Sequence, residues 1–486
     1  MMLTLSTAGA YFYSTMGHDQ ALLMGIGRLL LSGQICFIDF YEIQFPTSMF
    51  LQIFPALLER FLPISPIFAF FLWAIGVTVV SCAACFSVAR RFQLFAYKEI
   101  IFLTVTVAGI SLSVDFYSFG LREHLFVLAF LPFLLLRLAR IEKTDFRYEV
   151  DGLIGLVTGV FVTMKPHFLI FPLLLESYVL LKTRGNYWTV LKKREFQFFV
   201  IGVAGFFLHF LLLGKDYRVS FLNFSLNHGI SGYNAYNAPL SYIAKTLVNG
   251  KMLFLGGMLF YYLWTTRYSS FEKHLAAGLS LCFCGGVLIY IVQQKGWHYQ
   301  ALPIYFFGSL ITILALRNFF RMASFLVCCG LFFFLCHNIM TSLDKKPPGV
   351  VSYLQEPSKS AKTVWFLGTG VEVPYPATLM VKKPFCGTFL WLYPLPGFYY
   401  KESFSGYHTF KEMTPLEKFV VSMLYHDLVQ KQPQLIVMNQ YGEQAMDTRF
   451  SLAEYLESIP PIHKILQANY DKQAVGDLWL YSFQRN

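Results

Sequence analysis

The sequence predicts a polytopic α-helical membrane protein with a C-terminal extracytoplasmic α/β domain. Of its 486 residues, 56% are hydrophobic and only 14% are charged, and the mean hydropathy is +0.50. This balance lies outside that of soluble globular proteins. Apolar runs of about 16 to 22 residues recur along roughly the first 340 positions, and each is about long enough to cross a hydrocarbon core as a helix.

About eleven transmembrane helices are expected from these runs. A closed barrel is a poor alternative, because barrel strands alternate in polarity whereas runs such as 201–213 are apolar on nearly every side. The expected spans are 1–16, 65–88, 99–115, 124–141, 150–165, 168–182, 197–214, 252–266, 274–293, 299–316 and 322–341.

The basic residues orient these spans. Alternate loops carry groups of Lys and Arg, and the positive-inside rule places those loops in the cytoplasm. The opposite loops, roughly 17–64, 116–123, 215–251 and 294–298, the turn at Lys165 and the tail after Thr341, are then extracytoplasmic. The net charge of +11 follows from this topology and not from nucleic-acid binding, because the basic residues share no amphipathic face. The cytoplasmic groups are Arg90, Arg91 and Lys98; Arg137, Arg140, Lys143 and Arg147; Lys182, Arg184, Lys192, Lys193 and Arg194; Arg267 and Lys273; and Arg317 and Arg321.

Two domains are predicted. Residues 1–344 form the transmembrane domain, whose first outer loop, 17–64, contains amphipathic helices. Residues 345–486 form a soluble extracytoplasmic domain, which begins with a Lys-Lys-Pro-Pro-Gly linker. Strands are expected at 364–367, 435–438 and 477–483, and a helix at 415–430, an order typical of a small α/β layer. This domain contains no Gly-rich phosphate loop, nucleophile elbow or metal motif.

The first outer loop contains acidic residues that are candidates for chemistry. Asp19 follows the first span directly, and Asp39 and Glu42 lie about twenty residues later. A carboxylate at a membrane surface can deprotonate an acceptor hydroxyl, because a low-dielectric setting raises its pKa. The alternative stays open that Asp19 is a helix N-cap and that Asp39 and Glu42 are merely solvated.

Two shorter outer loops carry charged residues beside spans. Arg122, Glu123 and His124 form a charged triplet beside a span. Such charges cost free energy at a membrane and usually mark a functional site, and Arg122 could hold a phosphate through two hydrogen bonds. An interfacial ion pair is the simpler alternative. Lys165 stands before a helix-ending proline, where snorkelling explains it as well as ligand binding does.

The sharpest signal is the segment from Gln293 to Gln300. It places Lys295, Trp297 and His298 in one turn between apolar helices. Lys295 and His298 can neutralise a departing phosphate, and Trp297 can stack on a sugar or lie at the headgroup level.

The order of these features resembles the GT-C glycosyltransferases, above all the protein mannosyltransferase and aminoarabinose transferase relatives. The shared pattern is a first span, an Asp directly after it, an amphipathic helix with a small-residue turn, a second acidic residue, and a proline, here Pro46, that opens the next helix. The turn at Lys165 and the Lys295–His298 loop resemble lysine-bearing loops near the lipid phosphate in such enzymes. Gln20 stands where many relatives carry a second acid.

The resemblance implies the function. Such enzymes take a sugar from a polyprenyl-phosphate donor, and Asp19 matches their catalytic carboxylate. We therefore expect an inverting transferase in a bacterial inner membrane that acts on an envelope glycan, lipid or protein acceptor at the extracytoplasmic face. Gln20 makes a metal site less expected, so no cofactor is predicted and a divalent metal is not supported by the sequence. The tail resembles domains for which acceptor recognition is the usual proposal.

Two other classes stay open. A transporter or flippase for a lipid-linked glycan would favour charged residues near the middle of several spans, or an inverted repeat. Within the spans only Glu176 and His209 are candidates, and no internal symmetry is apparent. An O-antigen ligase or polymerase would use a large Arg-rich outer loop late in the membrane region, whereas the late loops here are short.

Overall fold

The computed structural model describes most of the chain between Met16 and Gln484. The described residues are 16–143, 149–183, 187–224, 230–265, 270–317, 361–372, 374–381, 383, 385–400, 404–441, 446–447 and 449–484.

The chain divides into two compact units, which are described separately. Unit 1 comprises Met1–Ser14, Phe45–Leu211 and Ala238–Asp344. Unit 2 comprises Thr15–Gln44, Leu212–Asn237 and Lys345–Asn486. The C-terminal domain therefore shares unit 2 with pieces of two loops that the sequence assigns to the extracytoplasmic side.

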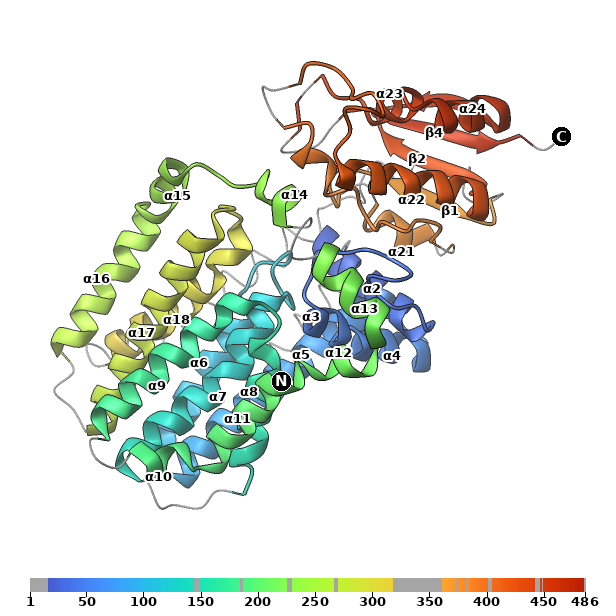
Figure 1. Cartoon of the computed structure of the whole chain (residues 1–486). Coiled ribbons are helices and arrows are strands. Elements are labelled where there is room, and N and C mark those ends of the chain that lie inside the picture. The colour runs from blue at the N-terminus through green and yellow to red at the C-terminus, as the bar shows by residue number, and fades with distance from the viewer. Residues whose placement is uncertain are drawn as a thin grey trace. The chain divides into compact units, whose positions relative to one another are not determined.

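Unit 1 is built from helices of very different lengths (Figure 1). The predicted spans between 65 and 316 each coincide with one or two of them. Their bounds are α3 Pro46–Phe50, α4 Ile53–Phe61, α5 Pro66–Arg91, α6 Tyr97–Leu112, α7 Arg122–Glu142, α8 Asp151–Val162, η1 Pro166–Leu169, α9 Ile170–Lys182, α10 Tyr187–Leu191, α11 Arg194–Gly205, α12 Leu208–Leu212, α15 Leu240–Leu247, α16 Gly250–Thr265, α17 Ser270–Gln293, η3 His298–Ala301 and α18 Leu302–Arg317.

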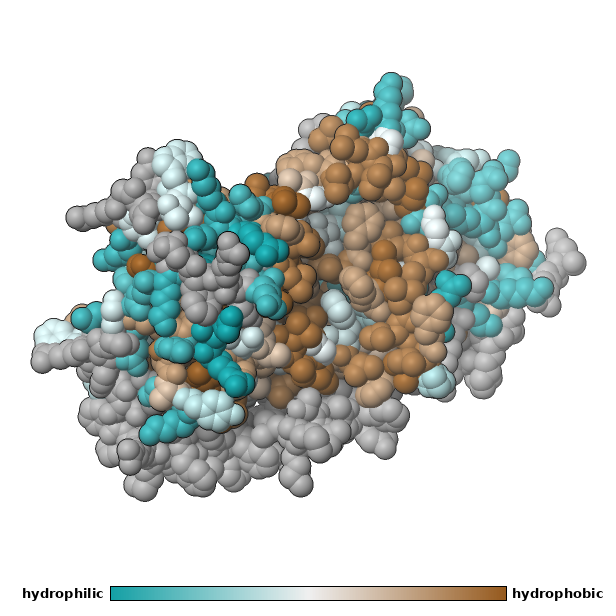
Figure 2. All heavy atoms as spheres, turned by 90° about the horizontal axis from the view of Figure 1, so that it is seen from below, coloured by the Kyte–Doolittle hydropathy of each residue, from teal (hydrophilic) through white to brown (hydrophobic). Residues whose placement is uncertain are grey.

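Helices of membrane-spanning length indicate a membrane protein. Among the described residues, five helices are long and apolar enough to cross a bilayer, and a pair bent by 58°, Leu240–Leu247 with Gly250–Trp264, adds a sixth if it is one span. Figure 2 shows hydrophobic side chains spread over a broad part of the surface. The total of eleven stays a prediction, and the runs 1–15 and 322–341 lie outside the described residues. The five helices are Pro66–Arg91, Arg122–Glu142, Arg194–Leu212, Ser270–Gln293 and His298–Leu316.

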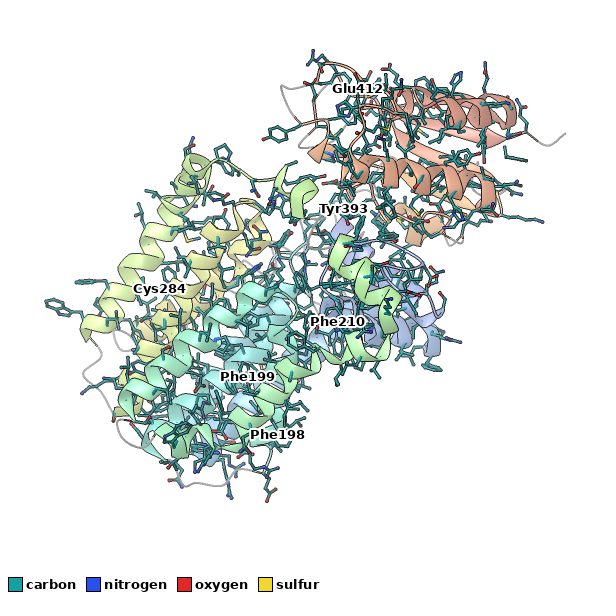
Figure 3. The ribbon with its side chains drawn as sticks, in the orientation of Figure 1. Phe198, Phe199, Phe210, Cys284, Tyr393 and Glu412 are labelled. Carbon is teal, nitrogen blue, oxygen red and sulfur yellow. The ribbon has the colours of Figure 1, made fainter. Side chains whose placement is uncertain are left out.

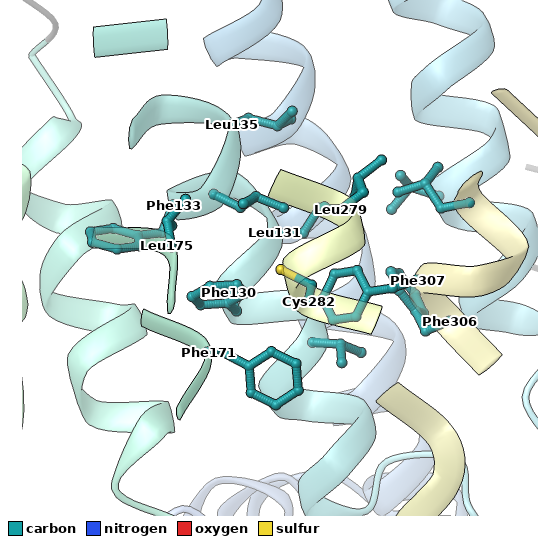
Figure 4. Close-up of a cluster of buried hydrophobic side chains, with 14 of the residues drawn as sticks. Phe130, Leu131, Phe133, Leu135, Phe171, Leu175, Leu279, Cys282, Phe306 and Phe307 are labelled. Atoms are coloured by element: carbon teal, nitrogen blue, oxygen red, sulfur yellow. The ribbon is translucent and has the colours of Figure 1, made fainter. Parts of the chain in front are cut away.

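Helix α7 lies at the centre of unit 1. Every residue from Glu123 to Arg140 is buried, and α7 contacts α5, α8, α9, α17 and α18. In a bilayer an apolar helix can face either lipid or protein, and α7 is buried because five other helices surround it. Figure 4 shows part of this core, with Phe130, Leu131, Phe133 and Leu135 of α7, Phe171 and Leu175 of α9, Leu279 and Cys282 of α17, and Phe306 and Phe307 of α18.

Glycines bring α8 and α11 into close contact. A Cβ on Gly155 would lie 1.9 Å from the carbonyl oxygen of Glu195, and one on Gly159 would lie 2.2 Å from that of Phe199. This small-xxx-small spacing lets two membrane helices approach through their backbones. Phe198 and Phe199, labelled in Figure 3, lie on α11 at this contact.

A network of buried charges joins α7, near its C-terminal end, to α8, α9 and α11. Arg137 donates to Glu176 of α9 at 2.5 and 2.7 Å and to Glu195 of α11 at 3.1 Å. Arg140 donates to Glu195 at 2.9 Å and to Asp151 of α8 at 3.1 Å. Both arginines were expected in a cytoplasmic loop. The placement in a loop is wrong, since both arginines lie inside α7 and are buried among carboxylates. That this end of α7 faces the cytoplasm stays a prediction.

Unit 2 joins three stretches of the chain. Tyr41 donates its backbone N–H to the carbonyl of Thr388 at 2.7 Å, and the Tyr236 hydroxyl donates to the carbonyl of Thr369 at 2.9 Å. Gly232 packs so closely on Pro394 that a Cβ would lie 3.0 Å from its Cα. The helices of unit 2 are α2 His18–Leu31, α13 Gly214–Phe221, α14 Ile230–Asn234, α21 Ala377–Val381, η4 Leu395–Gly397, α22 Pro415–Lys431, α23 Leu452–Glu457 and α24 Pro460–Asn469.

Helix α2 differs in character from its prediction. The stretch 21–31 was expected to be amphipathic, yet every residue from Gln20 to Gly27 is buried. Gly25 lies against the ring of Tyr375, where a Cβ would be 2.9 Å from the nearest ring carbon. The helix is therefore part of the core of unit 2 and not a helix lying on a surface.

The sheet of unit 2 has four strands in the order β1-β2-β4-β3. β1 (Val364–Leu367) runs parallel to β2 (Leu435–Asn439), and β4 (Leu478–Phe483) is antiparallel to both β2 and β3 (Tyr470–Val475). The strands predicted at 364–367, 435–438 and 477–483 and the helix at 415–430 are confirmed. β3, α23 and α24 were not predicted.

Candidate functional site

Polar side chains from three loops gather at the end of unit 1 where α7 and α18 begin. Lys165, before η1, forms an ion pair with Glu123 of α7. Its Nζ also lies 3.4 Å from Oε1 of Gln293, at the end of α17, and 5.5 Å from the ring centre of Tyr299. The structure thus brings together two predicted site residues, Glu123 and Lys165, from loops far apart in sequence.

Lys165 does not snorkel. Its side chain is 8% exposed and that of Glu123 is fully buried. Among the described residues, Oε2 of Glu123 and Nε2 of Gln293 have no hydrogen-bond partner. Buried polar atoms without partners are uncommon in proteins, so this pair retains capacity for a further polar contact.

Of the triplet at the start of α7, His124 has a structural place. Its Nδ1 accepts the backbone N–H of Gly120 at 3.0 Å, and its ring packs on Phe119 at 4.8 Å. Gly120 has a left-handed backbone, φ 76°, which glycine adopts without steric cost. His124 therefore fixes the turn before α7. Arg122 is half-buried at the first position of the helix.

A cavity of about 320 Å³ lies beside this cluster. His298 and Asp115 line it, with Nδ1 of His298 3.5 Å from Oδ2 of Asp115. Burial raises the pKa of Asp115, but hydrogen bonds from His298 and Ser118 outweigh it and hold the pKa below its usual value. Its lining is Ile110, Ser113, Val114, Asp115, Ser118, Lys251, His298, Leu302, Tyr305, Phe306 and Ser309.

The cavity has a polar and an apolar part. Asp115 and Lys251 carry charge and His298 does so when protonated, whereas Leu302 and Phe306 are among its apolar walls. Sequence reasoning selected His298 but neither Asp115 nor Lys251. Asp115 is the last residue of the predicted span 99–115 and Lys251 the last residue of the outer loop 215–251. A charged residue at the outer end of a span is the signal that could have identified them.

Lys295 and Trp297 do not line the cavity. Burial lowers the pKa of Lys295 to about 8. Its neighbours Gln294 and Gly296 both have left-handed backbones, φ 52° and 69°, and the Gln294 carbonyl accepts the N–H of Ala238 at 2.5 Å. Trp297 is half-buried, with its ring 5.8 Å from that of Tyr299.

In unit 2, Asp19 lies in the first turn of α2. Gly17 is the N-cap, so Asp19 is not, and Oε1 of the buried Gln20 accepts the backbone N–H of Gly17 at 2.9 Å. Asp19 lies 4.0 Å from Nε2 of His18, and its side chain is 19% exposed. Gln20, the departure from the GT-C pattern, thus closes the start of the helix, and the carboxylate of Asp19 remains accessible.

The other two acids of this loop have different places. Asp39 is exposed, and its Oδ2 accepts the N–H of Ile35 at 2.7 Å. Glu42 is 1% exposed, and its oxygens accept the N–H of Ile43 at 3.0 Å and Nε1–H of Trp391 at 2.9 Å. The open alternative that Glu42 is merely solvated is therefore wrong.

Within the described part of the chain, no group of three or more His, Cys, Asp or Glu side chains is arranged to hold a metal ion. Cys36 and Cys386, both buried in unit 2, are free thiols.

Comparison with known proteins adds no assignment. No protein-family model matches the sequence, and no curated protein matches it significantly.

Proposed function

We propose that this protein is an integral membrane glycosyltransferase of the GT-C type, which moves a sugar from a polyprenyl-phosphate donor to an envelope glycan, lipid or protein acceptor at the extracytoplasmic face. The observation that carries the proposal is the cavity of unit 1. Its Lys251 ammonium and its His298 imidazole, which Asp115 holds from the other side, suit a phosphate. Its apolar walls, Leu302 and Phe306 among them, suit the first isoprene units.

The proposed reaction is one displacement. The acceptor hydroxyl attacks the anomeric carbon, the glycosyl C–O bond breaks, and its electron pair leaves with the polyprenyl phosphate. The hydroxyl proton passes to the carboxylate of Asp19, the general base. Lys251 and His298 stabilise the negative charge that grows on the phosphate.

Asp115 has a positioning role in this proposal. Because its carboxylate faces Nδ1 of His298, it holds the ring and favours a proton on both nitrogens, so that Nε2 donates to the phosphate. The pair Lys165–Glu123 and the loop at Lys295 shape the same end of unit 1. The proposal accordingly expects Lys295→Ala to weaken donor binding more than folding.

Donor binding tests the proposal. The purified protein in nanodiscs is titrated with a polyprenyl phosphate of medium chain length, and the affinities of Lys251→Ala and His298→Ala are compared with wild type. Each loses a charge-assisted contact, so affinity falls roughly tenfold. Lys245→Ala, which removes an exposed lysine outside the cavity, is the matched control. Unchanged affinity in both cavity variants would remove the donor site.

A further inference from the structure

The buried ion pair of Lys165 and Glu123 limits what this end of unit 1 can bind. Lys165 stands before η1, and Glu123 lies in the first turn of α7. The carboxylate balances the ammonium within the pair. A lysine whose charge is balanced in this way attracts a phosphate less than a lone lysine does. A ligand at this pair therefore depends on the hydrogen-bonding groups around it more than on charge.

Two buried polar atoms beside the pair do not engage Lys165. Gln293 places its Oε1 3.4 Å from Nζ of Lys165. Since an ammonium only donates, the amide oxygen is the atom that faces it, and the N–H groups on Nε2 of Gln293 are directed elsewhere. Glu123 likewise turns Oε1 to Lys165. Among the residues that the structure describes, Oε2 of Glu123 and Nε2 of Gln293 have no hydrogen-bond partner.

A third group of this kind belongs to His167, in η1. Burial lowers the pKa of His167 to about 3, with a smaller contribution from the charges of Lys165 and Arg122, so the ring is neutral. Within the described part of the chain, its Nε2 is buried and has no partner. A neutral imidazole nitrogen either donates or accepts one hydrogen bond. The cluster of Glu123, His167 and Gln293 thus combines an acceptor, a donor and a group that can be either.

This mixture of groups selects one chemical class. An ionised phosphate oxygen only accepts hydrogen bonds, so it cannot pair with Oε2 of Glu123 and is repelled by it. An ammonium only donates, so it cannot pair with Nε2 of Gln293 and is repelled by Lys165 and Arg122. A hydroxyl both donates and accepts, and a neutral sugar carries several hydroxyls. A neutral sugar therefore satisfies all three groups of the cluster, whereas neither ion does.

The cluster lies next to the cavity of the proposed donor phosphate. His298 lines that cavity, and the following residue, Tyr299, has its ring centre 5.5 Å from Nζ of Lys165. Both residues belong to η3, and consecutive Cα atoms are only about 3.8 Å apart. In the proposed donor the sugar is bonded directly to the phosphate. A sugar on a phosphate held by His298 is therefore near the cluster.

We infer that Glu123, His167 and Gln293 form the sugar subsite of the donor, and that this subsite takes a neutral, hydroxyl-bearing sugar. Oε2 of Glu123 accepts from one hydroxyl, and Nε2 of Gln293 donates to another. Lys165 holds both side chains in place, a positioning role that differs from the phosphate contact implied by the sequence resemblance. The inference rests on the proposed function, because it assigns another part of the same donor.

Binding of matched lipids tests the inference. The full-length protein in nanodiscs is titrated with phosphodiesters of one medium-length polyprenol that differ only in the second ester group. In the reference lipid this group is methyl; in the others it is glucose, galactose, mannose, arabinose or 4-amino-4-deoxyarabinose. The ratio of dissociation constants to that of the methyl lipid isolates the contribution of the sugar. Wild type is expected to bind at least one neutral-sugar lipid roughly tenfold more tightly than the methyl lipid.

One substitution removes the amide donor at nearly constant size. Gln293→Met, in a protein that melts like wild type, should weaken binding of the preferred sugar lipid roughly tenfold and change that of the methyl lipid by about twofold at most. His167→Phe removes the imidazole nitrogens and carries the same expectation. Gln197→Met, which changes an exposed glutamine of α11, is the matched control and should keep the full ratio.

Deoxy analogues separate a direct contact from a structural effect. Lipids that each lack one hydroxyl of the preferred sugar are compared in wild type and Gln293→Met. The hydroxyl that Gln293 binds is identified by a loss of affinity of roughly tenfold in wild type that shrinks to about twofold or less in the variant. A purely structural role of Gln293 would lower the affinity for all these lipids by one common factor.

The outcomes distinguish this inference from the proposed function. If wild type binds neither the methyl lipid nor any sugar lipid, the donor function is contradicted and the inference fails with it. Binding of the methyl lipid with no gain from any neutral sugar, or a gain confined to the amino sugar, overturns the inference alone. An equal effect of Gln293→Met on the methyl and sugar lipids does so too.

Discussion

Oε2 of Glu42 accepts a hydrogen bond from the indole N–H of Trp391 at 2.9 Å, and both groups are buried. This contact ties the loop after α2 to the C-terminal domain across 349 positions of sequence. The C-terminal domain and the segment that carries Asp19 therefore belong to one compact unit, although the sequence places them at opposite ends of the chain.

The Glu42–Trp391 contact predicts an energetic coupling. Glu42→Ala leaves the indole N–H without its acceptor and should cost about 1–3 kcal/mol of unfolding free energy. Trp391→Phe removes the donor. The thermal unfolding of both single variants and the double variant forms a cycle, in which a coupling near 1 kcal/mol is expected. Strict additivity would mean that the bond contributes nothing.

The start of α2 predicts a contrast between neighbours. Gln20→Ala removes the acceptor of the Gly17 N–H and should destabilise the protein by about 1 kcal/mol. Asp19→Asn should change stability by only about 0.5 kcal/mol, because it removes one charge from a first turn. Thermal melting of the two variants measures this difference. An Asp19 variant that melts far below the Gln20 variant would assign Asp19 a structural role.

The buried charge network predicts a large effect for one arginine and a small one for another. Arg137→Met leaves the buried carboxylate of Glu176 without a cation and should cost about 3–5 kcal/mol. Arg194 also faces this network, 3.8 Å from Asp151, but its side chain is 61% exposed, so Arg194→Met should cost about 0–1 kcal/mol. Unfolding in a detergent series compares them. The double variant Arg137→Met with Glu176→Met should recover part of the loss, and no recovery would contradict the charge argument.

Lys295 predicts a pH dependence of stability. Burial lowers the pKa of Lys295 in the folded protein to about 8, below the usual lysine value of 10.5. The unfolded chain therefore binds more protons between these two values, and stability rises as the pH rises from 8 toward 10.5. Lys295→Met removes this term. The melting temperature of the variant should exceed that of wild type below pH 8, and the difference should shrink above it. A difference in melting temperature that stays constant from pH 8 to 10.5 would mean that the pKa of Lys295 is not lowered by burial.

Sequence could predict the helices of unit 1 because apolar runs of membrane length have few alternatives to a helix. The sequence also indicated the polar end of unit 1, because charged and polar side chains are costly in lipid and gather in the loops between spans. It did not predict that Asp115 faces His298, because two loops 183 positions apart along the chain meet only through packing. Arg137 was placed in a loop for a related reason: the charge pattern along the sequence does not show the carboxylates of other helices, Glu176 and Glu195, that pair with it inside α7.

In unit 2, the strands of the C-terminal domain follow from short β-branched and aromatic runs. The strand β3 was missed because its central residues are exposed and polar, so that only its pairing with β4 identifies it. The burial of α2 was missed because its cover comes from residues such as Tyr375, which lie far away in sequence.

The central claim is tested most directly by turnover. Purified protein in nanodiscs is given a panel of polyprenyl-phosphate-linked sugars together with an envelope extract as acceptor, and the release of free polyprenyl phosphate is measured by mass spectrometry. We expect release from at least one donor by wild type, and a loss of roughly 100-fold or more in Asp19→Asn at unchanged melting temperature. Release that is equal in Asp19→Asn and wild type, or release from no donor by protein that binds polyprenyl phosphate, would contradict it.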